Sequence, residues 1–205
     1  MDFESANPSV VKSIKQRVLL NAWLRALRQP QTLPSIDDFQ TDGASDELPD
    51  MMGFNVENPG GGARFLITQE GARLTATYGN EHVEPAKRTN RYLDDAIGPE
   101  RYARVVPCYR ACVARRRPVY SVSTVLDADG KDVSYERLLL PFGGDGDVEQ
   151  IVGSYKAISI EGGFKIRNLM GVTPKAVPAI AIRAVIDRDF VPAAAHASDQ
   201  VVELD

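Results

Sequence analysis

The sequence is poor in the residues that most often hold metals, disulfides or haem. Its 205 residues include only two cysteines and two histidines. Cys108 and Cys112 are four residues apart within a helical pattern, which places both thiols on one face of a helix and does not suggest a disulfide. A zinc site would need further thiolate or imidazole ligands, and the histidines, His82 and His196, lie far away in the sequence. A single histidine such as His82, without a defined pocket, does not indicate haem. We therefore expect neither a metal site nor a haem group.

Several other classes of function also lack their usual signals. The formal net charge is -4, and the only basic run, Arg115 to Arg117, lies at the end of a predicted helix, where it complements the helix dipole. Nucleic-acid binding is therefore not expected. No apolar run reaches the roughly 18 to 20 residues of a membrane span. The first residues are acidic, whereas a signal peptide begins with basic residues. We expect a cytoplasmic protein without a membrane span.

Enzyme signatures are missing as well. Gly60 to Gly62 lack the following Lys and Ser or Thr of a phosphate-binding loop. There is no Gly-x-Ser-x-Gly motif, and no histidine and acid are spaced as a catalytic triad requires. The adjacent acids Asp37–Asp38 and Asp94–Asp95 suit turns and helix caps better than acid–base catalysis. The sequence predicts no catalytic residue and a protein that is not an enzyme.

The first thirty residues read as one amphipathic helix. Asn7 to Ser9 form a helix start, and apolar residues then recur at near-helical spacing until Pro30. These apolar residues are Val10, Ile14, Val18, Trp23, Leu24 and Leu27. The other side is basic, with Lys12, Lys15, Arg17, Arg25 and Arg28. We expect a helix of about five turns, whose basic side faces solvent or, less commonly, a partner or a membrane surface.

The middle of the chain combines two strands with helices. Residues 51–56 and 64–69 are rich in strand-forming residues and are joined by a loop rich in proline and glycine. The apolar residues within 71–97 are spaced too irregularly for one long element, so this segment is predicted to form short helices and loops. Gly98, with Pro99 after it, begins a longer helix that ends near Arg117, and Pro107 within it should bend the helix or displace its start.

Pro118 to Ile160 predict a meander of three antiparallel strands. Apolar and polar residues alternate, and two turns rich in aspartate and glycine separate the three runs. Leu138 to Leu140 break the alternation, so part of the middle strand should be apolar on both sides and covered by a second layer. Residues 163–205 hold only a weak strand-like run and a small, acidic tail, and we interpret them as a partly mobile extension.

This order of elements resembles a PAS domain, and in particular the PAS-like family common in alphaproteobacterial proteins. The resemblance spans Leu33 to Ile160. The segments that carry it are Leu33–Phe39, Arg64–Ile67, Tyr78–Gly79, Pro118–Val119, Asp129–Gly130, Tyr135–Phe142, Asp145–Gly146 and Ile151–Gly153, of which Tyr135–Phe142 reads YERLLLPF.

The resemblance implies an α+β fold with a PAS-like five-stranded antiparallel sheet, short helices on one face and an N-terminal amphipathic helix. The expected domains are the helix at 1–30, the PAS-like domain at 31–162 and the extension at 163–205. It also implies a stand-alone sensory or regulatory module that acts through a signalling partner protein. Because N-terminal helices often pair in PAS dimers, a homodimer is expected, with Trp23, Leu24 and Leu27 as contacts. No flavin-attachment cysteine motif of the light-sensing type is present.

A ligand pocket and an enzyme remain alternatives. By position, Tyr109, Cys112, Ser123 and Tyr135 are candidates for lining a small-molecule pocket between the meander and the 98–117 helix. They are better explained as core or sheet residues whose hydroxyls are satisfied. The alternative function is a cone-shaped α+β enzyme or a small-molecule-binding protein with an apolar pocket. Such an enzyme needs inward His, Asp or Arg groups, whereas the meander has mostly hydroxyl and aliphatic side chains, with Glu136 and Arg137 on opposite faces.

Overall fold

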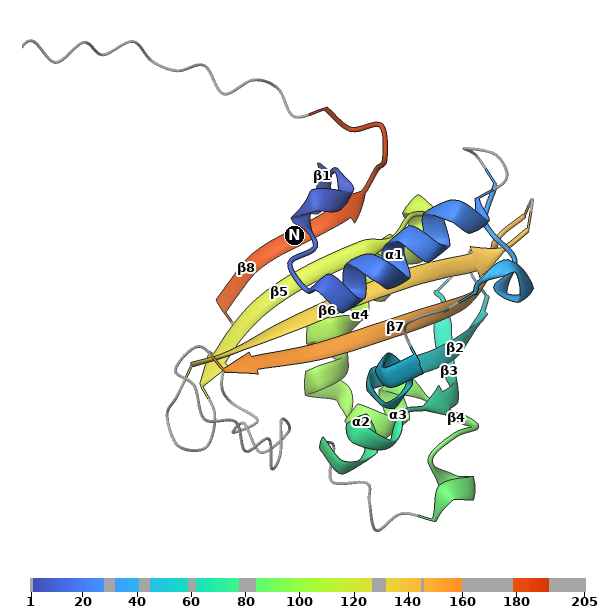
Figure 1. Cartoon of the computed structure of the whole chain (residues 1–205). Coiled ribbons are helices and arrows are strands. Elements are labelled where there is room, and N and C mark those ends of the chain that lie inside the picture. Colours follow the sequence, from blue (N-terminus) through green and yellow to red (C-terminus); the bar gives the residue numbers. More distant parts are fainter. Residues whose placement is uncertain are drawn as a thin grey trace, which may run out of the picture.

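One mixed sheet organises the part of the chain that the computed structural model describes (Figure 1). The described residues are 2–27, 32–40, 45–58, 62–77, 84–126, 132–144, 146–159 and 179–191. The sheet has eight strands in the order β1-β8-β5-β6-β7-β2-β3-β4. The predicted α+β class is confirmed at this level, since helices pack against one extended sheet.

Five antiparallel strands form the centre of the sheet in the order β5-β6-β7-β2-β3. Their bounds are Met51–Glu57 for β2, Arg64–Glu70 for β3, Val119–Leu126 for β5, Asp132–Gly143 for β6 and Val148–Ser159 for β7. All five coincide with the runs predicted from the sequence. The first of them, β2, pairs with the last, β7, and this pairing joins the early hairpin to the meander.

The sheet is wider than the five strands predicted from the sequence. β4 (Arg91–Tyr92) pairs with β3 at one edge. At the other edge β8 (Ala179–Ile186) pairs antiparallel with β5, and β1 (Glu4–Ala6) pairs parallel with β8. Part of the expected 163–205 extension therefore belongs to the sheet, because the end of β8 is buried there, with Ile186 1% exposed. Residues 187–191 follow β8, and the remainder of the extension, 163–178 and 192–205, lies outside the described residues.

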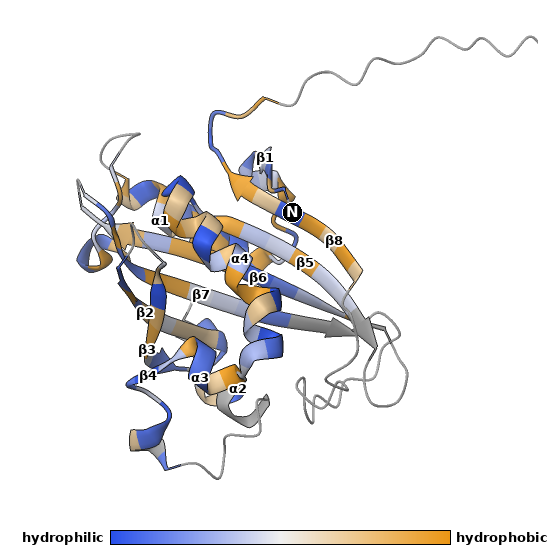
Figure 2. Ribbon diagram, turned by 180° about the vertical axis from the view of Figure 1, so that it is seen from behind, coloured by the Kyte–Doolittle hydropathy of each residue, from blue (hydrophilic) through white to orange (hydrophobic). Residues whose placement is uncertain are grey.

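Helices cover both faces of the sheet. α1 (Ile14–Ala26) lies in front of β6 and β7 in Figure 1, and α4 (Pro99–Arg115) lies on the opposite face. In Figure 2, seen from behind, apolar stretches of α4 lie over apolar stretches of the strands. The predicted second layer over Leu138 to Leu140 is therefore present, and all three leucines are at most 1% exposed.

Short helices connect these elements. They are the 3-10 helices η1 (Pro8–Val10), η2 (Ile36–Asp38), η3 (Ser45–Asp50) and η4 (Pro85–Lys87), and the short α-helices α2 (Ala72–Thr77) and α3 (Leu93–Ile97). The expectation of short helices and loops between β3 and α4 is confirmed. Among the described residues, no helix combines the length and the apolar composition that crossing a membrane requires.

The N-terminal helix begins later than predicted. Asn7 caps only the 3-10 turn η1, and Val11 is extended, with φ -71° and ψ 114°. Ser13 then caps α1, which has 13 residues, fewer than the five turns expected. Its buried face is also different, because Ile14 is 72% exposed and Val18 is 37% exposed. The residues that face the sheet are Gln16, Leu19, Leu20, Ala22 and Trp23.

The helix predicted after Gly98 is confirmed. Gly98 precedes it with φ 75°, Pro99 stands in its first turn, and Arg116 ends it in the left-handed conformation. The helix runs without interruption through Pro107. Cys108 and Cys112 lie within it as free thiols, as the spacing predicted, and both are buried.

Candidate functional site

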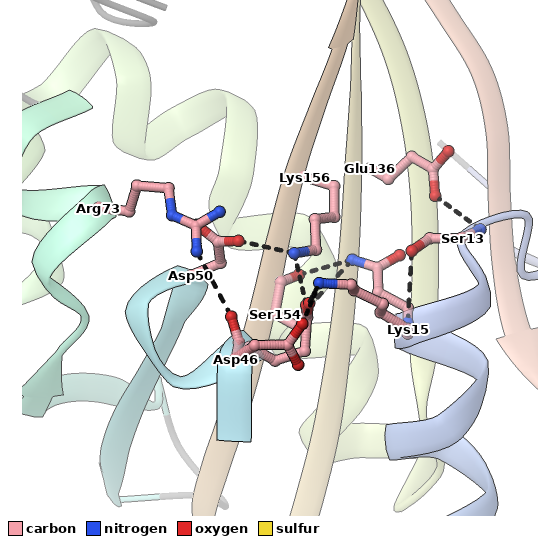
Figure 3. A network of polar contacts seen from close by, with 10 residues as sticks. Ser13, Lys15, Asp46, Asp50, Arg73, Glu136, Ser154 and Lys156 are labelled. Carbon is pink, nitrogen blue, oxygen red and sulfur yellow. Dashed lines mark hydrogen bonds and ion pairs between the residues drawn. The ribbon is translucent and has the colours of Figure 1, made fainter. Parts of the chain in front are cut away.

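The start of α1 rests on a buried carboxylate of the sheet. Glu136 of β6 is 3% exposed, and its Oε2 accepts hydrogen bonds from the backbone N–H of Ser13, at 3.2 Å, and from the hydroxyl of Tyr120, at 2.9 Å. The backbone N–H of Lys12 donates to the hydroxyl oxygen of Tyr120 at 3.1 Å. A negative charge at a helix N-terminus is favourable because the first N–H groups point toward it. Figure 3 shows Glu136 reaching Ser13 from the sheet.

The hydroxyl of Tyr120 is held in its neutral form by this site. Burial raises its pKa well above the ordinary value, the N–H of Lys12 lowers it, and the hydrogen bond to Glu136 raises it further. A phenol that donates to a carboxylate cannot ionise without losing that bond and placing two negative charges together. Tyr120 is therefore a hydrogen-bond donor at neutral pH.

One turn further, Gln16 connects α1 to β7. Its side-chain Nε2 donates to the backbone oxygen of Ser154 at 3.1 Å and to the Ser154 hydroxyl at 3.4 Å. Both residues are at most 1% exposed. Gln16 Oε1 is buried and has no hydrogen-bond partner among the described atoms. Because a buried polar side chain stabilises only when its partners are correctly placed, Gln16 fixes the position of α1 on the sheet.

A cluster of ion pairs joins β7 to η3 beside Gln16. Lys156 Nζ lies 2.5 Å from Glu47 Oε2 and 2.6 Å from Asp50 Oδ2. The Glu47 side chain is fully buried, and the side chains of Asp50 and Lys156 are 9% and 16% exposed. Arg73 of α2 completes the cluster on the far side, with its Nε 3.2 Å from Asp50 Oδ1. Lys156 is therefore the buried counter-ion of two carboxylates (Figure 3).

The same cluster reaches α1 through Lys15. Lys15 Nζ lies 2.5 Å from Asp46 Oδ2 and 3.1 Å from Glu47 Oε1. The Asp46 carboxylate and then Glu47 raise the pKa of Lys15, and Lys15 in turn lowers the pKa of Asp46. Three cations thus face three carboxylates across α1, η3, β7 and α2. This arrangement ties α1, η3, β7 and α2 together.

At its other end α1 is attached by Trp23. The indole Nε1 donates to the backbone oxygen of Pro141 in β6 at 2.7 Å, and the side chain is 1% exposed. Leu19 and Leu20, one turn earlier, have no exposed surface. Apolar burial therefore dominates the C-terminal half of α1, whereas polar contacts dominate its first turn.

The residues proposed as dimer contacts differ in exposure. Trp23 is buried against the sheet of its own chain, so its indole does not lie on the surface where a second copy would bind. Leu24 and Leu27 are partly exposed, although both also pack against the core. The most exposed apolar side chain of α1 is instead Ile14, which the sequence pattern had assigned to the buried side.

Two of the four pocket candidates fill the core on the opposite face. The Tyr109 ring lies 5.2 Å from the ring of Phe54 and 5.0 Å from that of Phe65, and its hydroxyl hydrogen-bonds that of Tyr155. The Cys112 thiol lies 3.9 Å from the backbone oxygen of Leu139. Burial raises the pKa of Cys112 well above the ordinary value. Tyr109 and Cys112 are thus packed against the sheet.

The other two pocket candidates lie opposite each other in the sheet. Ser123 of β5 pairs with Tyr135 of β6, and both side chains are half-buried. Arg137, two residues after Tyr135, points to α4, where it donates to Cys108. Glu136 and Arg137 therefore lie on opposite faces, as predicted.

The described residues include neither histidine nor a cluster of metal ligands. His82, the weak haem candidate, and His196 lie outside them. Within the described ranges, no three His, Cys, Asp or Glu side chains are arranged to hold a metal ion.

Sequence reasoning missed the polar residues that attach α1. Glu47, Asp50 and Lys156 lie in segments that read as an acidic connector and an ordinary strand, and nothing in their spacing links them. Glu136 offered one signal, since a charged residue within a strand that is apolar on both faces needs a buried partner.

Comparison with known proteins adds no neighbour to this description. No protein-family model, curated protein or solved structure matches the chain.

Proposed function

We propose that this chain is a PAS-type regulatory module that acts through protein–protein interaction. Support comes first from the five antiparallel strands β5-β6-β7-β2-β3, with α2, α3 and α4 inserted between β3 and β5 along the chain. This is the element order on which the resemblance to PAS domains rests.

The observation that carries the proposal is the attachment of α1. The helix lies on the face of the sheet opposite α4 and contacts β6 through Glu136, β7 through Ser154 and η3 through Glu47. A displacement of any of these elements changes the hydrogen bonds or ion pairs that hold α1. A helix coupled in this way can pass a change in the sheet to a protein bound on its outer side.

The polar groups of the site favour this role over catalysis. Glu136 is engaged by Tyr120 and Ser13, and the carboxylates of Glu47 and Asp50 are engaged by lysine and arginine side chains. A catalytic acid or base must reach a substrate proton, whereas these groups already bind one another within the core.

The test is capture of the full-length chain with its neighbours in the source cells. A tagged chain is cross-linked in cells, purified and quantified by mass spectrometry beside the tag alone. The proposal expects one or a few signalling proteins at near-stoichiometric amounts, each of which binds again when both proteins are purified. Recovery of chaperones alone, or failure of every captured protein to bind again, would contradict it.

The homodimer is a separate part of this proposal and has its own measurement. Sedimentation velocity at increasing protein concentration should show a dimer that is weakened by Leu24→Asp, because a charge at a half-buried apolar contact is costly to desolvate. A chain that stays monomeric at high concentration removes the homodimer from the proposal.

A further inference from the structure

We infer that the exposed side of α1 is a docking surface for an acidic amphipathic segment of a partner protein. The inference rests on the proposed function and names the chemistry of its partner. The surface, here called the basic α1 face, consists of Lys12, Ile14, Arg17, Val18, Asn21 and Arg25, all of which are exposed.

Two apolar side chains lie at the centre of the basic α1 face. Ile14, Val18, Asn21 and Arg25 follow one another at spacings of four, three and four residues, which places them along one stripe of a helix. Ile14 is 72% exposed and Val18 is 37% exposed. Single exposed apolar residues are ordinary. Here two of them are neighbours on a helix whose other large apolar residues face the protein.

The charged side chains of the basic α1 face are all positive. α1 contains no acidic residue. Within the described part of the chain, the side chains of Lys12, Arg17 and Arg25 take part in no hydrogen bond or ion pair, whereas Lys15 on the flank is engaged by Asp46. The whole chain is acidic, with a formal net charge of -4. A local cationic surface on an acidic protein attracts an acidic partner.

The helix that carries this surface is attached to the sheet at both ends. Glu136, Ser154 and Pro141 hold α1 from below at its first residues and near its end. A preordered helix loses little conformational entropy on binding, so more of the energy of its contacts with a partner appears as affinity.

A protein segment fits this surface better than a membrane does. Helices that lie in a membrane interface turn large residues such as Trp, Phe and Leu toward the lipid. In α1 these residues point the other way, since Leu19, Leu20 and Trp23 are buried against the sheet. Only Ile14 and Val18 would reach a lipid layer, whereas both suit the apolar stripe of a partner helix.

The test places a photo-cross-linker on the basic α1 face of the full chain. p-Benzoylphenylalanine replaces Val18 in one protein and, as a control, the 83% exposed Val191 in another. Each protein is irradiated in a lysate of the source cells, and the cross-linked peptide is sequenced by mass spectrometry. We expect position 18 to capture a peptide of net negative charge with apolar residues three or four apart, and position 191 not to capture it.

Charge reversal provides the second readout. Arg17→Glu with Arg25→Glu should lower the yield at position 18 by at least about tenfold, because like charges then face each other. Arg188→Glu makes the same kind of change at an exposed arginine on another surface and should leave the yield unchanged. Circular dichroism and thermal unfolding verify that the variants fold, as expected for exposed side chains.

Several outcomes would overturn the inference. They are equal capture at positions 18 and 191, cross-links only to lipid or to another copy of this chain, a basic captured peptide, or a yield that survives charge reversal. If a partner found with the tagged chain binds the reversed variant normally, the docking surface is wrong while the regulatory function stands. If no partner binds the chain at all, the proposed function itself fails.

Discussion

Replacement of Lys156 by methionine tests whether the ion cluster beneath α1 is truly buried. Methionine keeps most of the apolar stem but removes the charge that lies 2.5 Å from Glu47 and 2.6 Å from Asp50. Leaving buried carboxylates without their cation costs about 3–5 kcal/mol. The lower end applies, because Lys15 still lies 3.1 Å from Glu47 and Arg73 still lies 3.2 Å from Asp50. We therefore expect a loss of about 3 kcal/mol in the free energy of unfolding.

Urea unfolding provides the measurement. The single tryptophan, Trp23, is buried against the sheet, so its fluorescence reports the loss of α1 packing. The Lys156→Met variant should unfold at lower urea concentration with an unchanged slope, which indicates a change in stability alone. The variants Glu47→Gln and Lys156→Met/Glu47→Gln complete a double-mutant cycle. The double variant should be more stable than the sum of the two losses predicts, by about 1–3 kcal/mol.

Lys15→Met is the matched control within the same cluster. Lys15 and Asp46 are 50% and 62% exposed, so water already screens this pair, and the buried Glu47 keeps Lys156 when Lys15 is lost. The loss of Lys15 should therefore change stability much less than the loss of Lys156. A Lys156→Met variant that loses less than about 1 kcal/mol, the range of surface pairs, or that matches Lys15→Met, would refute the argument from burial.

Three further changes test other parts of the site. The pKa of Tyr120 is raised in the folded protein, so folding stabilises its neutral form. The stability that this contributes is fully present below about pH 10 and should be lost as the pH rises further. Tyr120→Phe should make urea midpoints measured between neutral and alkaline pH fall less steeply. Trp23→Phe removes the donor to the Pro141 carbonyl and should cost about 1–3 kcal/mol; urea unfolding of this variant is followed by circular dichroism, because it lacks the only tryptophan. Cys108 and Cys112 should react with Ellman's reagent only after unfolding, because both are buried and burial raises the pKa of Cys112; fast reaction in the native state would contradict this packing.

The sequence was sufficient for the elements whose signals are local. Alternation and turn residues located the strands of the meander, and Gly98 followed by Pro99 located the start of α4. The coverage of Leu138 to Leu140 on both faces also followed from their pattern, since three consecutive leucines in a strand cannot all point to one side.

Neither the first residue of α1 nor its buried face could be predicted from the neighbouring sequence alone. Asn7 and Ser13 are both good caps, and each does accept a backbone N–H, but only Ser13 precedes an α-helix. The residue at which the α-helix starts depends on Glu136, which lies in a strand 123 positions away in the sequence and accepts a hydrogen bond from the backbone N–H of Ser13. Gln16 is polar, so an apolar pattern does not place it on the buried face, yet the backbone oxygen of Ser154 accepts a hydrogen bond from its amide in the core. Such pairings appear only once the sheet exists.

The contacts of α1 also explain why the helix has one position on the sheet. From Ser13 to Trp23 the chain advances ten residues, which is roughly 15 Å along a helix. Their acceptors in β6, Glu136 and Pro141, are five residues apart, which is roughly 17 Å along a strand. The two spacings agree when α1 runs along β6 in the same direction. A slide by one helical turn would break both hydrogen bonds and that of Gln16 to β7, whereas Leu19 and Leu20 could still meet apolar side chains. Apolar burial therefore supplies most of the attachment energy, and the polar contacts select the register in which α1 presents its outer side.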